Sequence, residues 1–131
     1  MTKREMKYEC YKDLLEKNMV SVEMILNQLK KLEGKQGIID QDILMKDQIE
    51  TKLNLELSLA TLCILLRKMT ENQFIQLSQE LRRDLNSIIH SNRFEFDDEL
   101  IVYSQKGREE VNLDEILSFC QTVLLNDNVL L

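Results

Sequence analysis

This chain contains no proline and only three glycines among its 131 residues. Proline interrupts helices and glycine weakens them, so a chain nearly free of both favours long helices over a turn-rich sandwich or barrel. Apolar residues make up 44% and charged residues 31%, which is typical of neither a disordered nor a membrane-embedded chain. The length suits one hydrophobic core. We therefore expect a single helical domain over residues 1–131.

The apolar spacing predicts two long N-terminal helices. The first covers about Thr2 to Leu32 and the second about Asp40 to Lys68, with the turn Gly34-Lys35-Gln36-Gly37 between them. Residues 57–66 are apolar almost all round, which favours the second helix as the central, most buried one. In each helix one apolar stripe is expected to face the core. The stripes consist of Met6, Cys10, Leu14, Val22, Ile25, Leu29 and Leu32 in the first helix, and of Ile43, Ile49, Leu53, Leu57, Ala60 and Ile64 in the second.

A third helix is predicted from a capping motif and an apolar face. Thr70-Glu71-Asn72-Gln73 matches a capping box, with Thr70 as the N-cap and Gln73 reaching back to it. The helix that follows is expected to end near His90. Its apolar face consists of Phe74, Leu77, Leu81, Leu85 and Ile88.

The pattern changes period after this helix. Apolar residues between Phe94 and Tyr103 flank Asp97-Asp98-Glu99, which predicts a short β-hairpin. A turn at Lys106-Gly107 follows, and Asn112 with Glu115 three residues later opens a last helix. The chain is therefore expected to fold as an all-α bundle of four to five helices, with two long N-terminal helices and a short β-hairpin before the last helix.

Cysteine and histidine counts limit the chemistry. The three cysteines are far apart and there is one histidine, so one chain offers neither a disulfide framework nor a four-ligand zinc site. No hydrophobic segment follows the charged N-terminus, and the longest apolar run, Leu57 to Leu66, is too short to span a bilayer. We expect a cytoplasmic protein without metal or other cofactor. Acid–base chemistry near neutral pH must use His90 or a strongly shifted group.

Polar residues gather on one face of the third helix. Arg83 and His90 are seven residues apart, so they differ by only about 20° around the helix axis. Asn86 and Ser87 lie between them on the same stripe, apart from the apolar face. An arginine that holds a phosphate beside a histidine that exchanges protons is a plausible phosphodiester-cleaving pair.

The run from Leu81 to Phe94 resembles the signature helix of the HEPN superfamily. That signature is an arginine, often followed by a polar residue, and then a histidine after four to six intervening residues. Arg83, Asp84 and His90 fit it with six intervening residues. The hairpin, the Lys-Gly turn and the acidic-capped last helix are also similar to many HEPN proteins, so the specific part of the resemblance covers about residues 80–117.

The resemblance implies a metal-independent endoribonuclease of the kind found in toxin–antitoxin and phage-defence systems. Arg83 would orient the scissile phosphate and His90 would assist attack by the RNA 2′-hydroxyl. Asp84, Asn86 and Ser87 would be supporting polar groups. Apart from the resemblance, Arg82 and Arg93 are candidate RNA contacts, since with Lys106 and Arg108 they could form a basic rim around the same helix end. A solvated surface offset by the neighbouring acidic residues is the alternative, and we favour it because those acidic residues repel phosphate.

The resemblance also bears on assembly and partners. One histidine per chain supplies either a base or an acid, so a homodimer that pairs two signature helices would complete the site, which is the habit of HEPN proteins. An antitoxin or another regulatory protein is a further expected partner. HEPN toxins controlled by a nucleotidyltransferase often carry tyrosine two residues after the histidine, where this chain has Asn92.

A second reading of the same residues is a non-catalytic helical protein-interaction module: a degenerate HEPN domain, an inhibitor or an adaptor. His90 would then be an ordinary helix-terminal histidine and Arg83 an exposed residue paired with Glu80 or Ser87. The net charge of −6 and the acidic hairpin favour this reading, because they repel phosphate. Asp97-Asp98-Glu99 resembles a solvated turn more than a Mg²⁺ or Ca²⁺ site.

Overall fold

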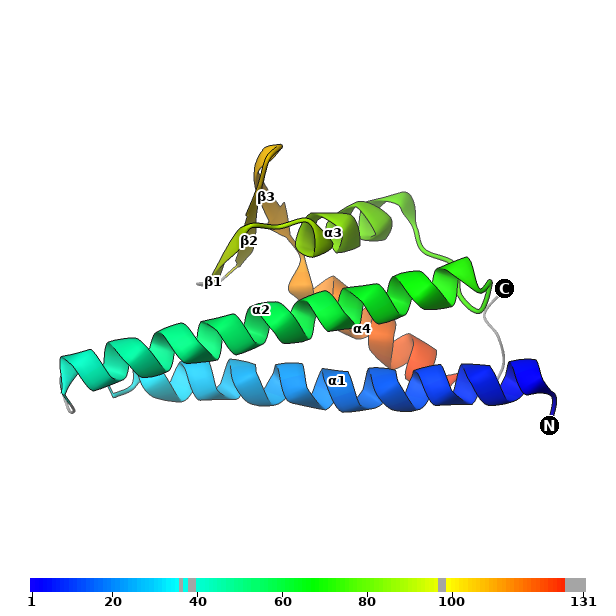
Figure 1. The fold of residues 1–131 in the computed structure, drawn as a ribbon, viewed down its shortest axis with the longest axis horizontal. Coiled ribbons are helices and arrows are strands. Elements are labelled where there is room, and N and C mark those ends of the chain that lie inside the picture. Colours follow the sequence, from blue (N-terminus) through cyan, green and yellow to red (C-terminus); the bar gives the residue numbers. More distant parts are fainter. Residues whose placement is uncertain (36, 38–39, 97–98, 127–131) are drawn as a thin grey trace.

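The structure is a computed structural model that describes residues 1–35, 37, 40–96 and 99–126. Within this part of the chain it is an all-α bundle with a small antiparallel sheet before the last helix, which confirms the expected fold class (Figure 1). The elements in chain order are α1 (Lys3–Glu33), α2 (Gln41–Glu71), α3 (Gln79–Ile89), β1 (Arg93–Phe96), β2 (Leu100–Ser104), β3 (Gly107–Val111) and α4 (Leu113–Leu125).

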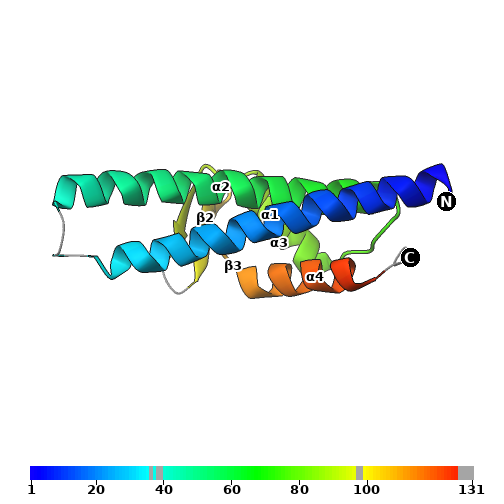
Figure 2. The ribbon, with the colours of Figure 1, turned by 90° about the horizontal axis from the view of Figure 1, so that it is seen from below.

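The two long helices form an antiparallel hairpin along the longest axis of the molecule. In Figure 1, α1 lies on one side of α2, whereas α3 and the sheet lie on the opposite side. The second view shows that α4 covers a further face of the α1–α2 hairpin (Figure 2). The core lies where these helices meet, and it includes Leu15 and Val22 of α1 and Leu59, Leu62 and Leu66 of α2, all fully buried.

The helix starts follow from local capping. Thr2 accepts a hydrogen bond from the Glu5 backbone while the Glu5 side chain accepts one from the Thr2 backbone, a complete capping box. Asp40 caps α2, and Asn112 caps α4 through the Glu115 backbone nitrogen at 3.1 Å. The predicted starts of the first, second and last helices are therefore confirmed.

The predicted start of the third helix is wrong. Thr70 lies inside α2, where its hydroxyl donates to the Leu66 carbonyl at 2.8 Å instead of capping a new helix. α2 continues to Glu71, and Gln73 takes a positive φ of 62° in the loop that follows. α3 begins later, where Ser78 accepts from the Leu81 backbone nitrogen at 3.1 Å. The sequence has a capping-box pattern at Thr70, but α2 continues through this residue and the Thr70 hydroxyl bonds to a carbonyl of the same helix.

The predicted core stripe of α1 is wrong in its N-terminal half. Met6, Cys10 and Leu14 are exposed, whereas Val22, Ile25 and Leu29 are buried as expected. The buried face of the N-terminal half consists instead of Tyr8, Lys12, Leu15 and Met19. Lys12 can belong to it because its Nζ donates to the Asn126 carbonyl at 2.6 Å.

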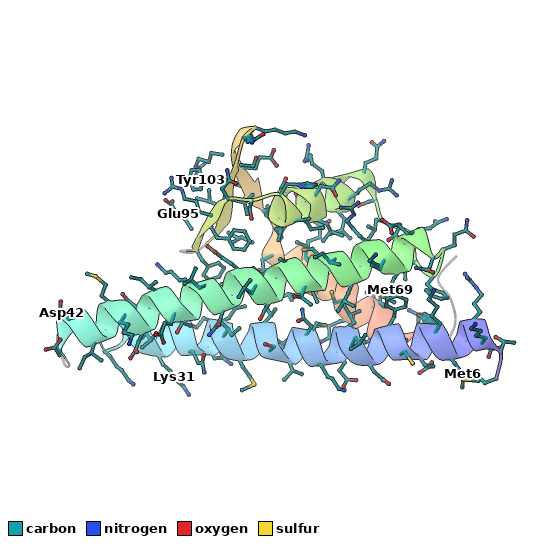
Figure 3. All side chains as sticks on the ribbon, viewed as in Figure 1. Met6, Lys31, Asp42, Met69, Glu95 and Tyr103 are labelled. Atoms are coloured by element: carbon teal, nitrogen blue, oxygen red, sulfur yellow. The ribbon has the colours of Figure 1, made fainter. Side chains whose placement is uncertain are left out.

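The predicted core stripe of α2 is wrong at all of its large residues, and only Ala60 is half-buried. Its five large members are exposed by 44–69% of their surface: Ile43, Ile49, Leu53, Leu57 and Ile64. The buried residues are Leu44, Leu55, Leu59, Leu62, Cys63, Leu66 and Met69. Figure 3 shows the contrast between the labelled methionines, since Met69 lies between α2 and α1 whereas Met6 projects away from the bundle. Both stripes of α2 have helical spacing, so the period alone could not choose between them.

The sheet has three strands in the order β1-β2-β3, one more than predicted. β1 pairs with β2 in a register that places Phe94 opposite Val102, which confirms the hairpin. Asp97 and Asp98 lie outside the described residues. β2 then pairs with β3 around Gly107, whose φ of +110° suits glycine in a tight turn. The third strand folds back toward α3 and thereby shapes the site described below.

No helix in the described part of the chain is long and apolar enough to cross a membrane.

Candidate functional site

The third helix positions the predicted site residues by its amphipathic pattern. Leu81, Leu85 and Ile88 are buried, as predicted, against the rest of the bundle. The opposite face lines a cleft of about 830 Å³ between α3 and the β2–β3 end of the sheet. We call this the α3–β3 cleft. Its lining consists of Gln79, Arg82, Arg83, Asn86, Ser87, His90, Asn92, Ser104, Gln105, Lys106 and Glu109.

The structure brings Arg83, Asn86, Ser87 and His90 together in this cleft, as the seven-residue spacing predicts. His90 is the C-cap residue of α3, and its backbone N–H donates to the Asn86 carbonyl at 3.0 Å. Both Arg83 and His90 are exposed. Neither side chain forms a hydrogen bond or direct ion pair with another residue in the described ranges, so both are available to a ligand.

Ser87 ties the helix to the sheet. Its hydroxyl lies within hydrogen-bond distance of two acceptors, the Arg83 carbonyl at 3.0 Å within α3 and a carboxylate oxygen of Glu109 on β3, and shares its one proton between them. Glu109 is the one carboxylate on the wall of the α3–β3 cleft, as far as the chain is described. A serine that bridges the two walls fixes their separation. It also engages the negative charge that lies nearest to Arg83 and His90 in the cleft.

Asp84 does not lie in the α3–β3 cleft, although its neighbour Arg83 does. It is buried, and it lines a second cleft of about 710 Å³ on another side of α3. Burial raises the pKa of Asp84 above its ordinary value of 3.8, and Arg83 together with a hydrogen bond from the Asn112 backbone lowers it in part. Adjacent helix positions are about 100° apart, which separates Asp84 from the polar stripe. Asp84 is therefore the one predicted supporting residue that lies outside the α3–β3 cleft.

The two candidate RNA contacts have different positions. Arg82 lines the α3–β3 cleft, whereas Arg93 does not. The Arg93 guanidinium lies 4.2 Å from the centre of the Tyr103 ring and 4.0 Å from a carboxylate oxygen of Glu95. The Tyr103 hydroxyl donates to Glu95 at 3.0 Å, and Figure 3 shows these two residues together on the sheet. Arg93 is thus held on the outer strand by its neighbours.

The cleft wall that the sheet provides was not predicted from the sequence. Ser104, Gln105, Lys106 and Glu109 lie there because β3 folds back beside β2. The Lys106-Gly107 turn could have indicated this third strand, since a Gly-containing turn after one strand is typical of a second hairpin. The segment after it, Arg108-Glu109-Glu110-Val111, is too charged to be recognised as a strand.

The second cleft is mostly acidic, and we call it the acidic cleft. It is lined by Leu26, Lys30, Glu80, Arg83, Asp84, Phe96, Glu99, Leu100, Glu110, Val111, Asn112, Leu113 and Asp114. Arg83 is shared by both clefts. The acidic residues of the hairpin and of β3 that the structure describes therefore lie mainly away from the α3–β3 cleft.

The cysteines do not contribute to either cleft. Cys63 and Cys120 are buried, and burial raises the pKa of both thiols, that of Cys120 to about 12. Cys10 is exposed on α1. In the described ranges no three histidine, cysteine or acidic side chains are grouped so that they could hold a metal ion.

Comparisons with known proteins give no match to a family model, to a curated protein or to a solved structure.

Proposed function

We propose that this protein is a metal-independent endoribonuclease of the HEPN type that acts as a toxin or phage-defence effector. The single observation that supports this best is the joint exposure of Arg83 and His90 in one cleft. Arg82 and Lys106 add positive charge there, against one carboxylate that Ser87 already engages. The cleft is therefore suited to a phosphate group even though the whole chain carries a net charge of −6.

The residues of the cleft suit transesterification of an RNA phosphodiester. Arg83 and Arg82 would hold the phosphate oxygens, and the planar guanidinium of Arg83 can donate two parallel hydrogen bonds. His90 would accept the proton of the 2′-hydroxyl as its oxygen attacks phosphorus. A 2′,3′-cyclic phosphate forms, the bond from phosphorus to the 5′-oxygen breaks, and the departing oxygen takes up a proton.

The departing oxygen needs an acid at the same moment as the 2′-hydroxyl needs a base. The described part of the chain includes its only histidine, so a homodimer with a composite site would supply the second imidazole. Asn86 would serve as a further hydrogen-bond donor at the cleft wall, and Ser87 would hold Glu109 in place beside it.

The test is expression of the wild-type chain, His90→Ala and Arg83→Ala in bacteria. We expect growth arrest with cleaved RNA from the wild type and neither effect from the two variants. Arg108→Ala is the matched control, because Arg108 is exposed on β3 but does not line the α3–β3 cleft. Unchanged cleavage by the His90→Ala and Arg83→Ala variants would contradict the proposal.

A non-catalytic interaction module is the second candidate, and one observation favours it. Large apolar residues are exposed along the two long helices, among them Leu14, Val20 and Met24 of α1. Exposed apolar surface of this extent is typical of protein-binding faces. Under this function, the His90→Ala variant would bind the same protein partners as the wild type, and neither would cleave RNA.

A further inference from the structure

α2 carries a second periodic face that the bundle does not cover. Eight residues spaced alternately by four and three along the helix form it: Lys46, Glu50, Leu53, Leu57, Ala60, Ile64, Arg67 and Glu71. We call it the α2 heptad face. Leu53, Leu57 and Ile64 are exposed by 52%, 69% and 44%, and Ala60 is half-buried. Alternating spacings of four and three are those of the contact positions in a coiled coil.

The charges at the two ends of this face are arranged in the same order. Lys46 precedes Glu50 at the N-terminal end, and Arg67 precedes Glu71 at the C-terminal end. All four side chains are accessible, by between 39% and 77% of their surface. An antiparallel copy of the same face therefore places every charge opposite its complement, whereas a parallel copy in register places like charges opposite each other.

We propose that two copies of this chain associate through an antiparallel pair of α2 helices. In this register Lys46 lies opposite Glu71 of the partner subunit and Glu50 lies opposite Arg67 of the partner subunit. The apolar layers between them pair Leu53 with Ile64 of the partner subunit and Leu57 with Ala60 of the partner subunit. The small Ala60 receives the large Leu57, so the two central layers combine large and small side chains.

The partner is a second copy because the face complements itself. At both ends of the face a cation precedes a carboxylate, and a two-fold axis therefore places each cation opposite a carboxylate of the other copy. Binding to a different protein would not require this same order of charge at both ends. The apolar centre supplies the association free energy by leaving water, and the terminal charges select the direction and the register. The proposal does not require ribonuclease activity.

The position of this face on α2 decides where the two clefts lie in the dimer. Ser58, whose carbonyl accepts from the Asn18 amide at 2.8 Å, marks the side of α2 that packs on α1. Glu56, which accepts from the Phe94 backbone nitrogen at 3.1 Å, marks the side that carries the sheet. The α2 heptad face lies roughly a quarter turn from the Glu56 side and farther from the Ser58 side.

A two-fold axis between antiparallel helices runs perpendicular to the plane that contains them. Because the sheet side is a quarter turn from the contact face, both copies carry α3 and the sheet on the same side of the paired helices. The two α3–β3 clefts then flank the axis on one surface of the dimer.

The first experiment measures molar mass by light scattering after size-exclusion chromatography. We expect the wild-type chain to be a dimer and Leu57→Glu to be a monomer with unchanged helical content by circular dichroism. Met24→Glu is the matched control, because Met24 is exposed by 58% on α1 and lies outside the α2 heptad face; it should remain a dimer. A monomeric wild type, or a dimer that survives Leu57→Glu, would overturn the proposal.

The second experiment tests the register by charge exchange. Lys46→Glu and Glu71→Lys should each raise the dimer dissociation constant by about tenfold, because each creates two like-charged contacts per dimer. The double variant should restore the wild-type constant. Within one chain the double variant makes both local pairs like-charged, at Lys46–Glu50 and at Arg67–Glu71, so only contacts between copies can explain a restoration. Additive losses in the double variant would refute this register.

The same variants separate this inference from the proposed function. A wild-type dimer that Leu57→Glu dissociates, but that cleaves no RNA, supports the α2 interface and contradicts the nuclease. A wild-type chain that cleaves RNA while remaining monomeric contradicts the interface and leaves the nuclease with a site in a single chain.

Discussion

The two clefts beside α3 share Arg83 but have opposite electrostatic character. The α3–β3 cleft presents Arg82, Arg83 and Lys106 with His90, against the single carboxylate of Glu109. The acidic cleft presents Lys30 and Arg83 against five carboxylates, those of Glu80, Asp84, Glu99, Glu110 and Asp114. The net charge of a small acidic protein therefore does not describe its individual surfaces.

The alternation of β3 and the rotation along α3 produce this separation. On β3, Glu109 faces the α3–β3 cleft and Glu110 faces the acidic cleft, as neighbouring strand residues point to opposite faces. On α3, Arg83 and Asp84 diverge by about 100°. In both elements, neighbouring charged residues therefore line different clefts because of the ordinary periodicity of a strand and of a helix.

We expect the greatest change to be in catalysis, from the loss of His90, which lines the α3–β3 cleft but not the acidic cleft. His90→Ala should lower the rate constant of RNA cleavage by about 10²–10⁴-fold, since general acid–base catalysis supplies that much. The measurement is single-turnover cleavage of a labelled RNA. Asp114→Ala changes a residue of the acidic cleft and should leave the rate unchanged. An equal loss in both variants would mean that the two clefts do not differ in function.

A smaller effect is expected on RNA affinity. Arg82→Glu should weaken binding of a non-cleavable RNA by about tenfold and flatten its dependence on salt, because one phosphate contact and its counterion release are lost. Lys30→Glu reverses a cation of the acidic cleft and is the matched control, with no expected change in affinity. Fluorescence anisotropy across a salt series measures both. Equal weakening by Lys30→Glu would place RNA across both clefts.

The predicted parts of the site are those that local periodicity determines. Arg83 and His90 share a face of α3 because seven residues nearly complete two turns, and the opposite apolar face buries Leu85. Asp84 belonged to the signature but not to the stripe, and the rotation per residue was sufficient to exclude it from the cleft. Thr70 shows the limit of capping motifs, since a hydroxyl inside a helix can bond to the carbonyl four residues earlier.

The parts that sequence could not supply depend on packing between distant segments. α2 has apolar residues on two faces, and the choice between Leu59 and Leu57 as core depends on where α1 and α4 lie. β3 is charged along its length and becomes a strand because Gly107 folds it back onto β2. Ser87 and Glu109 are 22 residues apart in the chain, and the pairing of β3 with β2 brings them together.

The hydrogen bond from Ser87 links the two walls of the α3–β3 cleft and should contribute to stability. Ser87→Ala removes the hydroxyl that donates to Glu109 and should lower the free energy of unfolding by about 1.5–3 kcal/mol, the usual range for a hydrogen bond to a charged group. Urea denaturation followed by circular dichroism measures the change. Ser118→Ala, at an exposed position of α4, should lie within about 0.5 kcal/mol of the wild type. A loss no greater than that of Ser118→Ala would show that Ser87 does not hold the walls together.

The smallest effect concerns Asp84 and depends on pH. Because its pKa is raised in the folded protein, the folded state holds the proton more tightly than the unfolded state does. As pH rises from 3.8 through the raised value, the unfolded chain loses this proton first, so the free energy of unfolding decreases across that window and stays lower above it. Asp84→Asn carries no such charge and should have a flatter profile, with a gain over the wild type at neutral pH.

The control for Asp84→Asn is Asp114→Asn, which alters an exposed carboxylate of the same acidic cleft and should follow the wild-type profile. Thermal unfolding between pH 3 and pH 7 compares the three proteins. If Asp84→Asn were less stable than the wild type at neutral pH and equal to it at pH 3, the ionised Asp84 carboxylate would stabilise the fold, contrary to the prediction. The attraction of Arg83 for the Asp84 carboxylate would then outweigh the cost of burial. Arg83 would be held on the acidic side of the helix, and the contrast between the two clefts would be weaker than their lining residues indicate.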